Sequence, residues 1–590
     1  MVLDKNKLVR LFLISAGFLV YFYVFKPKSE TSALAPARPT TSQTAPLDVV
    51  HPSSPVAPFA ALLQGKEKDI TVENELLKVV LSTKGGTIKK VILKKFKDKH
   101  GKELVLLDAQ SSNMGFSFPY QNALIETKAL YFQTQAMPVY MVQDSGQARI
   151  VFRLAFTPSQ YFEQSFTFSG NSYQIDYDWR AVGMEACFNT TAQPAFCWNM
   201  DMKSLEADDK ADASRSTVNY YLLDQTFDKL KESATEVEAK KIEVPIKWVS
   251  IKQRFFSSAV IAQDAFATGA LRMEPMVSPD VTKSVHLSLP LSAKDKAAAH
   301  GKFIFFFGPN DYKILKKVTK GFEQNLPLGW PVVKWMNQGL IMPLFAFLEK
   351  YVSNYGLVIF LLVIIIKLLL APLSYRSFIS MAKMQVLKPE LDKIKEKYKN
   401  DLQKAQIEQV AFYREFGINP LSGCMPIMLQ MPILMAMFHF FPHAIALRQA
   451  SFLWANDLST YDSVMRLPFT IPIYGNHVSL FTLLMVLSTI LYTRASNQNG
   501  PKEGPMRGLS YVMPFAFMVV LNTFPAGLSF YYCISNVMTF LQQKLINYWV
   551  DADSIKEKLM ARQQKVKQRG KLSFQSRVAA SIEANNKKKK

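Results

Sequence analysis

Four long stretches that are almost free of charge occupy the C-terminal half of this 590-residue chain. They cover residues 355–373, 417–447, 467–493 and 508–543, and Lys367 is the one charged residue within them. A helix needs about 20 apolar residues to cross a hydrocarbon core that is ~30 Å thick. The stretches are long enough to do so, and the chain is therefore predicted to form a bundle of membrane-spanning helices.

The last of these stretches, residues 508–543, is too long for a single span. One helix of that length would reach ~54 Å at 1.5 Å per residue. Residues 522–527 read Asn-Thr-Phe-Pro-Ala-Gly, which is a turn signal in the middle of the stretch. Divided there, each half reaches only ~22 Å, less than the hydrocarbon core. The sequence thus predicts a five-span α-helical membrane core over residues 353–550, surrounded by thinned bilayer.

Another apolar run, residues 8–25, lies close to the N-terminus. The tripeptide Ala-Leu-Ala at 33–35 has the form of a signal-peptide cleavage site, but Pro36 follows it directly and the apolar run ends well before it. The run is also long and aromatic, so we expect residues 1–28 to be a retained N-terminal transmembrane anchor. Residues 29–60, rich in Pro, Ser, Thr and Ala, are typical of a disordered linker.

Residues 61–325 alternate between apolar and polar side chains, as β-strands do. Ile150, Phe152 and Leu154 would face one side of a sheet, while the residues between them face the other. Short turns containing Gly or Asn, such as Lys-Gly-Gly at 84–86, separate these segments. Many short alternating strands with such turns predict an antiparallel all-β sandwich.

Two other segments are predicted to depart from this strand pattern. Residues 201–243 are polar and rich in Ala, Lys and Glu, which favours a helical or mobile insertion. Residues 327–352 contain Trp330-Pro331 followed by an apolar face with few charges, which is typical of an amphipathic helix at the membrane interface. The alternative for this second segment is a helix packed beneath the sandwich.

The distribution of charge predicts which segments face the cytoplasm. With a cytoplasmic N-terminus, the four internal segments carry a net charge of +16 over 114 residues, whereas the 303 residues from 26 to 328 carry only +5. Because positive loops remain on the cytoplasmic side, we expect a multi-pass membrane protein with an external β-domain and a cytoplasmic C-terminus. Cys187 and Cys197 would lie in the oxidising compartment, and the sequence leaves both the bonded and the free state open.

Lys367 is the most informative residue of the apolar stretches. A charged side chain inside a span costs some kcal/mol and by default indicates a function. The alternative is that its ammonium reaches the cytoplasmic headgroups, because Leu373 ends the run only six residues later. Further polar residues within the spans favour a hydrated cavity around the lysine: Gln430, Ser535, Asn536 and Thr539.

The segments assigned to the cytoplasm contain two further predicted elements, a helical hairpin and a basic tail. Residues 374–416 predict an antiparallel helical hairpin, because Leu387, Leu391 and Ile394 form an apolar seam and a break follows near residue 400. The basic tail, residues 551–590, ends in four lysines. Such a tail suits RNA phosphate or anionic lipid, and the alternative is a solvated charge run that only fixes orientation.

Four segments of the chain closely resemble the YidC-type bacterial membrane protein insertases, a family shared with mitochondria and chloroplasts. They are SMAKMQVLKPEL at 380–391, INPLSGCMPIMLQMPI at 418–433, LRQASFLWANDLS at 447–459 and FPAGLSFYYCISNVMTFLQQKLI at 524–546. The resemblance covers about residues 327–550, and a weaker one, through WVSIKQRFFSSAVI, extends into the β-domain.

The resemblance implies a protein that inserts and helps fold inner-membrane proteins through a hydrophilic groove, without nucleotide hydrolysis, alone or with a Sec-type translocon. Lys367 stands where the family usually has Arg, which keeps the charge but loses the planar fork. By the same resemblance Gln430, Tyr531, Tyr532, Ser535 and Thr539 are groove or client-contact candidates, beside Asn536. The implied partners are nascent membrane-protein clients, the lipid bilayer and, through the basic tail and hairpin, the ribosome.

Other classes of function fit the sequence less well. No Walker A, Rossmann, HExxH or GxSxG motif is present, so we expect no enzyme, no catalytic residue and no cofactor. His439 and His443 have metal-ligand spacing, but Pro442 interrupts them and no third ligand is evident, so we expect no metal site. A transporter would explain Lys367, yet the spans show no internal repeat.

Overall fold

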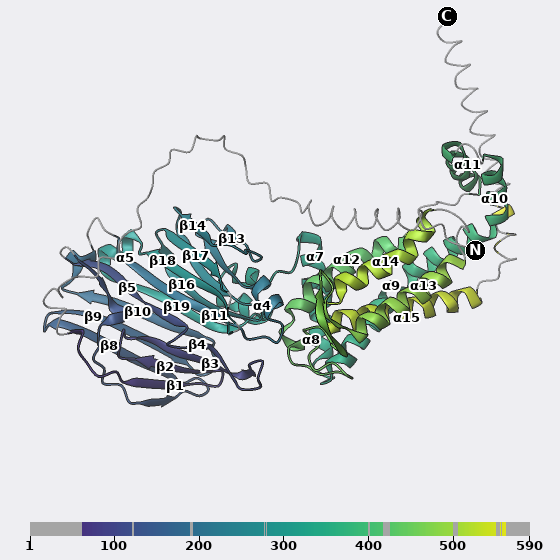
Figure 1. The fold of residues 1–590 in the computed structure, drawn as a ribbon. Coiled ribbons are helices and arrows are strands. Elements are labelled where there is room, and N and C mark those ends of the chain that lie inside the picture. The colour runs from purple at the N-terminus through teal and green to yellow at the C-terminus, as the bar shows by residue number, and fades with distance from the viewer. Residues whose placement is uncertain are drawn as a thin grey trace, which may run out of the picture. The chain divides into compact units, whose positions relative to one another are not determined.

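The computed structural model describes residues 62–120, 123–188, 193–276, 280–398, 402–416, 425–498 and 505–549, together with 278, 555, 557 and 559–561. The predicted anchor, the linker and most of the basic tail lie outside these residues. The described chain forms two compact units, one of strands that ends at Pro327 and one mainly of helices that begins at Leu328 (Figure 1).

The strand unit contains three sheets. The eight-stranded sheet has the order β13 (Phe227–Lys229), β12 (Thr217–Leu222), β15 (Ile246–Lys252), β16 (Phe256–Phe266), β19 (His300–Pro309), β10 (Gln174–Val182), β9 (Gln160–Ser169), β8 (Gln147–Thr157). The six-stranded sheet has the order β14 (Glu238–Ile242), β17 (Gly269–Pro275), β18 (Val281–Pro290), β11 (Ala195–Lys203), β5 (Ser112–Tyr120), β6 (Ala123–Glu126). The five-stranded sheet has the order β4 (Glu103–Leu107), β3 (Thr87–Lys97), β2 (Leu77–Ser82), β1 (Asp69–Glu73), β7 (Val139–Met141).

The eight- and six-stranded sheets pack face to face through an aromatic core. Phe116 on β5 lies 5.5 Å from Phe162 on β9 and 5.2 Å from Trp179 on β10, measured between ring centroids. Phe196 on β11 lies 5.7 Å from Phe303 on β19. Such ring pairs add about 0.5–1.5 kcal/mol each beyond the area they bury. The predicted antiparallel sandwich is confirmed, with β1 and β7 as a parallel pair within it.

Local patterns in the sequence account for these strands. Ile150, Phe152 and Leu154 on β8 are buried, as their alternation predicts. The predicted turn between β2 and β3 is also present, and Gly85 and Gly86 adopt φ values of 80° and 57° there. Only glycine enters this left-handed region without steric cost, which is why the chain can reverse at this point.

The prediction of a helical or mobile insertion over residues 201–243 is wrong. Three strands within this segment, β12, β13 and β14, extend the sheets, and α4 (Asp209–Arg215) is the helix within its described residues. Val218 and Tyr220 are buried on β12, which pairs with β15 along its whole length. The β-branched and aromatic residues of TVNYYL determine the local structure, whereas the charged residues that suggested a helix lie largely in the connections and at exposed positions.

Four short helices and two single turns complete the described part of the strand unit. They are α3 (Glu185–Phe188), α4, α5 (Ala293–Ala298), α6 (Tyr312–Val318), η1 (Thr127–Ala129) and η2 (Phe322–Asn325). Cys187 on α3 is buried and Cys197 on β11 is half-buried, and both are free thiols. The disulfide that the sequence left open is therefore absent.

The helical unit begins with a short broken helix and continues with longer ones. Its elements are α7 (Pro331–Met336), η3 (Asn337–Ile341), α8 (Met342–Leu348), α9 (Tyr355–Val386), α10 (Lys388–Lys397), α11 (Leu402–Glu415), α12 (Met425–Phe440), η5 (Phe441–His443), η6 (Ile445–Leu447), β20 (Met465–Ile471), β21 (Gly475–Val478), α13 (Leu480–Gln498), α14 (Pro505–Leu521) and α15 (Ala526–Trp549). The predicted break within 508–543 is present, since α14 and α15 are separate helices.

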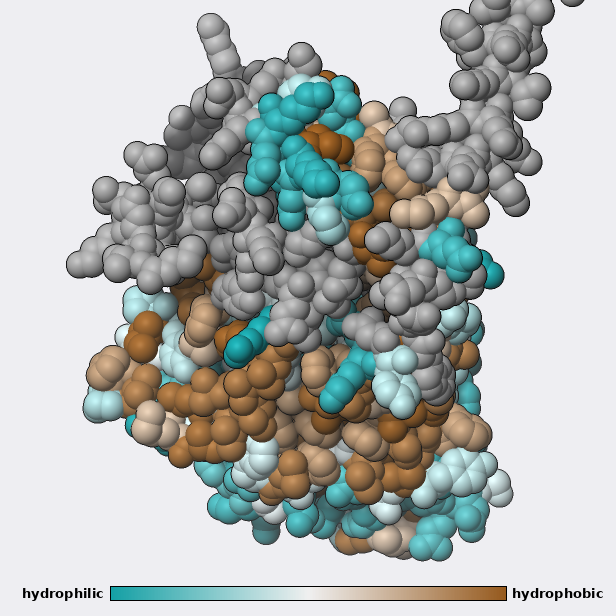
Figure 2. Space-filling view, turned by 90° about the vertical axis from the view of Figure 1, so that its right-hand side faces the viewer, coloured by the Kyte–Doolittle hydropathy of each residue, from teal (hydrophilic) through white to brown (hydrophobic). Residues whose placement is uncertain are grey.

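Within the described residues, the segment from Tyr355 to Met384 is the one helix that is both long and apolar enough to cross a membrane by composition. Shorter apolar segments lie in α13 (Leu480–Arg494) and α14 (Val512–Leu521). Figure 2, viewed from the side of the helical unit, shows broad brown areas of apolar residues on this face. The short apolar segment of α14 agrees with the predicted length of the first half of 508–543, whereas α15, with 24 residues, is longer than the predicted second half.

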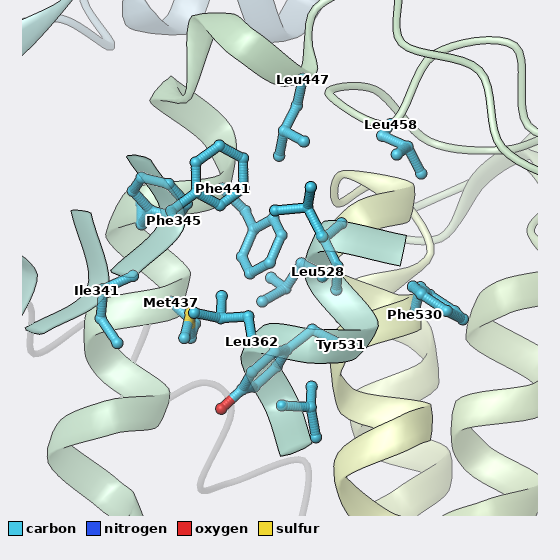
Figure 3. Close-up of a cluster of buried hydrophobic side chains, with 14 of the residues drawn as sticks. Ile341, Phe345, Leu362, Met437, Phe441, Leu447, Leu458, Leu528, Phe530 and Tyr531 are labelled. Carbon is cyan, nitrogen blue, oxygen red and sulfur yellow. The ribbon is translucent and has the colours of Figure 1, made fainter. Parts of the chain in front are cut away.

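The helices share one large apolar core. Figure 3 shows Phe345, Leu362, Phe441 and Leu528 pointing toward one another from α8, α9, η5 and α15, and all four are buried. Pro331 begins α7 directly after Trp330, as predicted. The broken helix α7–α8 packs on the bundle, since the ring of Phe345 lies 5.1 Å from that of Phe440 on α12.

The predicted helical hairpin begins later than residue 374. Helix α9 does not end near residue 373 but continues to Val386, because residues 373–386 contain neither Gly nor Pro. It ends at Val386, and Pro389 lies in the first turn of the next helix, α10, where proline is well tolerated. The hairpin therefore consists of α10 and α11 alone. Its seam uses Leu387 and Leu391, which pack with Phe416, Ile555 and Leu559.

Candidate functional site

The side chain of Lys367 is buried in the helical unit. It lies on α9, in the third to fourth turn from Tyr355, and only 4% of the residue is exposed. Its Nζ donates a hydrogen bond to Oγ1 of Thr539 on α15, at 2.7 Å. The same hydroxyl donates to the backbone oxygen of Ser535 at 2.7 Å, so its lone pairs are left to face the ammonium.

A second hydrogen bond joins the same two helices. Nε2 of Gln542 on α15 donates to the backbone oxygen of Lys367 at 3.2 Å. Residues 535, 539 and 542 are spaced four and three apart, which puts them on one face of α15. Lys367 is thus fixed at both its side chain and its backbone against the polar face of α15.

None of the ion pairs found among the described residues includes Lys367 (those pairs all lie in the strand unit or on α10). A lysine ammonium has three N–H donors, and Thr539 satisfies one of them. A buried charge without a counter-ion is costly, and this cost falls when a carboxylate approaches. The site is therefore suited to attract an acidic group of another molecule.

Asn536 faces a different helix from Lys367. Its Nδ2 donates to Oγ1 of Thr489 at 2.7 Å and to Oγ of Ser488 at 3.3 Å, both on α13. The sequence predicted that Asn536 shares a single cavity with Ser535 and Thr539. Adjacent residues on a helix point about 100° apart, so Ser535 and Asn536 cannot serve the same face. The structure instead forms two polar contacts, one from α15 to α9 and one from α15 to α13.

The remaining predicted residues are placed around these contacts. Tyr531 is buried in the apolar core beside Phe441, at 5.8 Å between ring centroids, and its hydroxyl points away from that core (Figure 3). Tyr532 is half-buried, with its ring 6.3 Å from that of Phe438. Gln430 is half-buried on α12. The hydrogen bonds of Lys367 described above involve none of these three side chains.

Sequence reasoning missed four polar residues of this region. Gln542 bonds the backbone of Lys367, Ser488 and Thr489 hold Asn536, and Gln543 is only 5% exposed. The sequence does contain a signal for Gln542, because this residue lies one helical turn after Thr539, on the face that Ser535 and Thr539 share. No comparable signal identified the Ser-Thr pair on α13, since an isolated pair of hydroxyls within a span is common.

A second polar cluster closes one end of the bundle. The carboxylate of Asp462 accepts hydrogen bonds from the backbone N–H groups of Leu480 and Phe481 at 2.9 and 3.0 Å. It also accepts from Nε1 of Trp454 at 2.8 Å. A negative charge at the N-terminus of α13 is favourable, because the first N–H groups of a helix have no partner within it.

The side chain of Asn522 joins this end of α13 to the end of α14. Its Oδ1 accepts from the backbone N–H of Ser479 at 3.0 Å, and its Nδ2 donates to the backbone oxygen of His477 at 2.8 Å. Thr539 lies 13 residues along α15 from Ala526, or about 20 Å. The bundle is therefore sealed by hydrogen bonds at one end, with the lysine contact well inside it.

A buried cationic cluster also lies within the strand unit. Nζ of Lys252 donates to the backbone oxygen of Arg215 at 2.8 Å, and Nζ of Lys283 donates to the backbone oxygen of Glu232 at 2.6 Å. Burial lowers the pKa of both lysines to about 8. Both amines donate hydrogen bonds to backbone carbonyls, and these bonds hold connecting segments against the sheets.

A cavity of about 620 Å³ lies on one face of the six-stranded sheet. Its floor includes Asn113, Asn199 and His286 on three neighbouring strands. Oδ1 of Asn199 lies 3.1 Å from Nδ1 of His286, and its Nδ2 donates to Asn113 at 3.4 Å. The described residues include no group of three or more His, Cys, Asp or Glu that could hold a metal ion.

Comparison with known proteins identifies the family. Residues 347–553 match the family model described as the 60 kDa inner membrane protein, and residues 69–343 match that of the YidC periplasmic domain. The membrane protein insertase YidC of Amoebophilus asiaticus is 47% identical over 599 residues, which cover 99% of each chain. This chain belongs to the YidC family of membrane protein insertases. The insertase of Cytophaga hutchinsonii is 38% identical, over 95% of this chain and 94% of its own.

The YidC family matches confirm the resemblance seen in the sequence. The relatives are named for membrane protein insertion, in agreement with the expectation that the chain is not an enzyme. A crystal structure of an active YidC insertase aligns with 83% of this chain and 94% of its own, at 17% identity and a TM-score of 0.33. Membership of the family rests on the sequence matches.

Proposed function

We propose that this chain inserts inner-membrane proteins, and helps them fold, through a hydrophilic groove in which Lys367 attracts acidic groups of the client. What supports the proposal is the buried ammonium of Lys367, which is held by Thr539 and forms no ion pair within the described part of the chain. The other groove candidates are Gln430, Tyr531, Tyr532, Ser535, Asn536 and Thr539.

The physical problem of insertion is the desolvation of a polar segment. A client must move its external polar residues across hydrocarbon, where each unsatisfied group costs several kcal/mol. Polar side chains on α9, α13 and α15 shorten that path from one side, and short helices thin the bilayer on the other. Burial of the client's apolar helix, at ~25 cal/mol per Å², then drives the step without nucleotide hydrolysis.

The topology belongs to the same proposal. Residues 1–28 form an anchor, 29–60 a linker, 61–325 a periplasmic domain and 353–550 a five-span core with its hairpin. Residues 327–352 lie at the membrane interface, and residues 551–590 form a cytoplasmic tail. The excess of positive charge on the segments assigned to the cytoplasm supports this orientation.

Two further partners are proposed for the working protein. The chain acts alone or with a Sec-type translocon. The ribosome binds the basic tail, whose lysines and arginines suit RNA phosphate, and the hairpin α10–α11 receives the emerging chain. These assignments rest on charge and on family membership.

The decisive experiment measures insertion into proteoliposomes without nucleotide. Paired single-span clients differ only in Asp or Asn residues of the external segment. Lys367→Arg should retain insertion of both clients, and Lys367→Ala should reduce insertion of the Asp client about tenfold, the effect of ~1.4 kcal/mol. The Asn client should be much less affected.

Equal loss of both clients in Lys367→Ala would mean that the lysine only holds α9 against α15. Full activity of that variant on the Asp client would show that the charge of Lys367 has no role in the mechanism. Lys334→Ala, which changes a half-buried lysine of the same unit outside this contact, is the matched control. Flux of small solutes without any client insertion would instead identify a transporter.

A further inference from the structure

An apolar β-hairpin lies between α12 and α13 in the chain. It consists of β20 and β21, and most of its large apolar side chains are exposed. Phe469 is 60% exposed and Ile473 is 74% exposed. Arg466 is the one charged residue between 463 and 476. The exposed apolar side chains of this hairpin are Val464, Met465, Phe469, Ile471 and Ile473.

Local stability does not explain these residues. Ile473 sits in the turn with a φ of 72°, a conformation that is a genuine outlier for a β-branched residue and would suit Gly or Asn. An isoleucine there is both strained and exposed to the surroundings. Strain of this kind persists where the residue serves another purpose.

The hairpin β20–β21 is held at its turn and along β21. Nδ2 of Asn522 donates to the backbone oxygen of Tyr474 at 2.9 Å and to that of His477 at 2.8 Å. The ring of His477 stacks on that of Tyr461 at 3.6 Å between centroids. The hairpin therefore keeps a fixed orientation relative to the ends of α13 and α14.

The hairpin β20–β21 is poorly suited to pairing with a strand of another protein. Pro468 and Pro472 lack the N–H that a neighbouring strand would need. Its own ladder is also irregular, since the register shifts between Arg466 and Ile471. An edge built in this way resists the addition of a strand.

We propose that the hairpin β20–β21 is a lipid anchor that places Phe469 and Ile473 at the headgroup–acyl boundary of the bilayer. The exposed apolar side chains of the hairpin suit the acyl side of that boundary. The incomplete ladder leaves backbone groups that need water, so the hairpin lies at the boundary and not in the hydrocarbon centre. Arg466 suits the lipid phosphates, and Tyr474 belongs to the residue type enriched at such interfaces.

The anchor has a consequence for the bundle. Asn522 fastens the hairpin to the end of α14, and Ser479 connects it to the start of α13. The depth of the hairpin in the lipid therefore sets the depth of these two helices, whose apolar segments are short. The hairpin thereby holds lipid close to the protein at that surface, where the short helices require a thinner bilayer.

Spin labels on the full chain test this directly. In a background with its four cysteines replaced, single labels are attached after Phe469→Cys or Ile473→Cys, and the protein is reconstituted in phosphatidylethanolamine–phosphatidylglycerol vesicles. The collision rates with oxygen and with a water-soluble nickel complex report depth. Reference labels are Leu487→Cys, on an exposed apolar position of α13, and Lys95→Cys, on an exposed position of β3.

The ratio of oxygen to nickel accessibility at 469 and 473 should lie several-fold above that at 95 and below that at 487. A ratio equal to that at residue 95 would place the hairpin in water and overturn the proposal. Loss of access to both reagents would show that a protein, such as a second copy of this chain, covers the hairpin, which also overturns it.

A second variant separates anchoring from folding. Phe469→Ser should make the label at 473 shallower, whereas the neighbouring exposed change Thr470→Ser should leave its depth unchanged. Circular dichroism of both variants should match that of the parent, because neither side chain is buried. Identical depths in the two variants would contradict the role of Phe469.

Discussion

The contact between Lys367 and Thr539 joins residues that are 172 positions apart, and no local pattern reveals it. The sequence does indicate that a charged residue in a span needs polar neighbours, and Thr539 is a candidate for that reason. The assignment of a specific partner depends on the rotation of α15, which brings Ser535, Thr539 and Gln542 to α9 and leaves Asn536 for α13. Rotation of this kind follows from packing of the whole bundle.

Thr539→Val tests whether the hydroxyl positions the lysine. The variant keeps the shape of the side chain and removes the acceptor of the Lys367 ammonium, so the stability of the bundle should fall by about 1–3 kcal/mol. Insertion of the Asp client should fall further than that of the Asn client, because the charge is no longer held in place. Thr539→Ser should restore both. The control is Thr489→Val, because the hydroxyl of Thr489 bonds Asn536 and the backbone of Met485 but not Lys367.

Thermal unfolding in detergent and the insertion assay provide the two measurements. If Thr539→Val behaved as Thr539→Ser does in both, the hydroxyl would have no role in holding the lysine.

The buried lysines of the strand unit predict a dependence of stability on pH. Their pKa values of about 8 lie below the ordinary 10.5, because burial disfavours the charged form. Between pH 8 and 10.5 the unfolded chain therefore binds more protons than the folded one, and stability rises with pH in that window. Each lysine contributes on the order of 1–3 kcal/mol to this rise.

Unfolding of a fragment spanning residues 62–327, followed by the fluorescence of its buried tryptophans from pH 7 to 10, measures the effect. Lys283→Met should flatten the rise by about one half, since Lys252 remains. An unchanged slope would show that Lys283 does not titrate in this range.

At the scale of single elements, the sequence predicted what short-range rules determine. Pro331 begins α7, the Asn-Thr-Phe-Pro-Ala-Gly segment separates α14 from α15, and the alternation of β8 defines its buried face. The prediction failed where neighbouring elements determine the structure. The strand β12 forms because β15 supplies its hydrogen bonds, although the composition around it favours a helix.

The hairpin α10–α11 shows how an element can extend beyond its own segment. Ile555 and Leu559, which follow α15, pack with Leu387, Leu391 and Phe416 at its base. The sequence predicted only a charged tail beyond residue 550. The first part of that tail therefore belongs to the folded hairpin, and only the residues after it are available for their charge.

Truncation after Ala561 tests the proposed ribosome contact without disturbing this packing. It removes ten Lys and Arg residues and keeps Ile555 and Leu559. Ribosome affinity should fall, and the slope of log affinity against log salt should flatten by about 0.7–0.9 for each phosphate that the tail had neutralised. Leu559→Ser in the full chain is the control, because it disturbs the hairpin α10–α11 and keeps the charge. Unchanged affinity after truncation would leave the tail as an orientation signal only.

The whole molecule consists of two units with separate apolar cores. The aromatic core of the sandwich is built from residues of its sheets, and the main core of the bundle begins at Val333 and contains no residue of the strand unit. All the groove candidates lie in the second unit. A division of this kind predicts that the two units contribute different parts of the function.

Deletion of most of residues 61–320, with the first span retained, should therefore leave measurable insertion of single-span clients. The bundle keeps its core, its Lys367–Thr539 contact and its sealed end, and each of these is made within the helical unit. The measurement is insertion into proteoliposomes at equal amounts of folded protein, checked by the thermal unfolding of the bundle. Adding Lys367→Ala to the deletion should reduce insertion of the Asp client by the same factor as in the full chain. Complete loss of insertion in a bundle that still unfolds at its normal temperature would place the essential step in the strand unit, because the groove would then be intact and yet inactive.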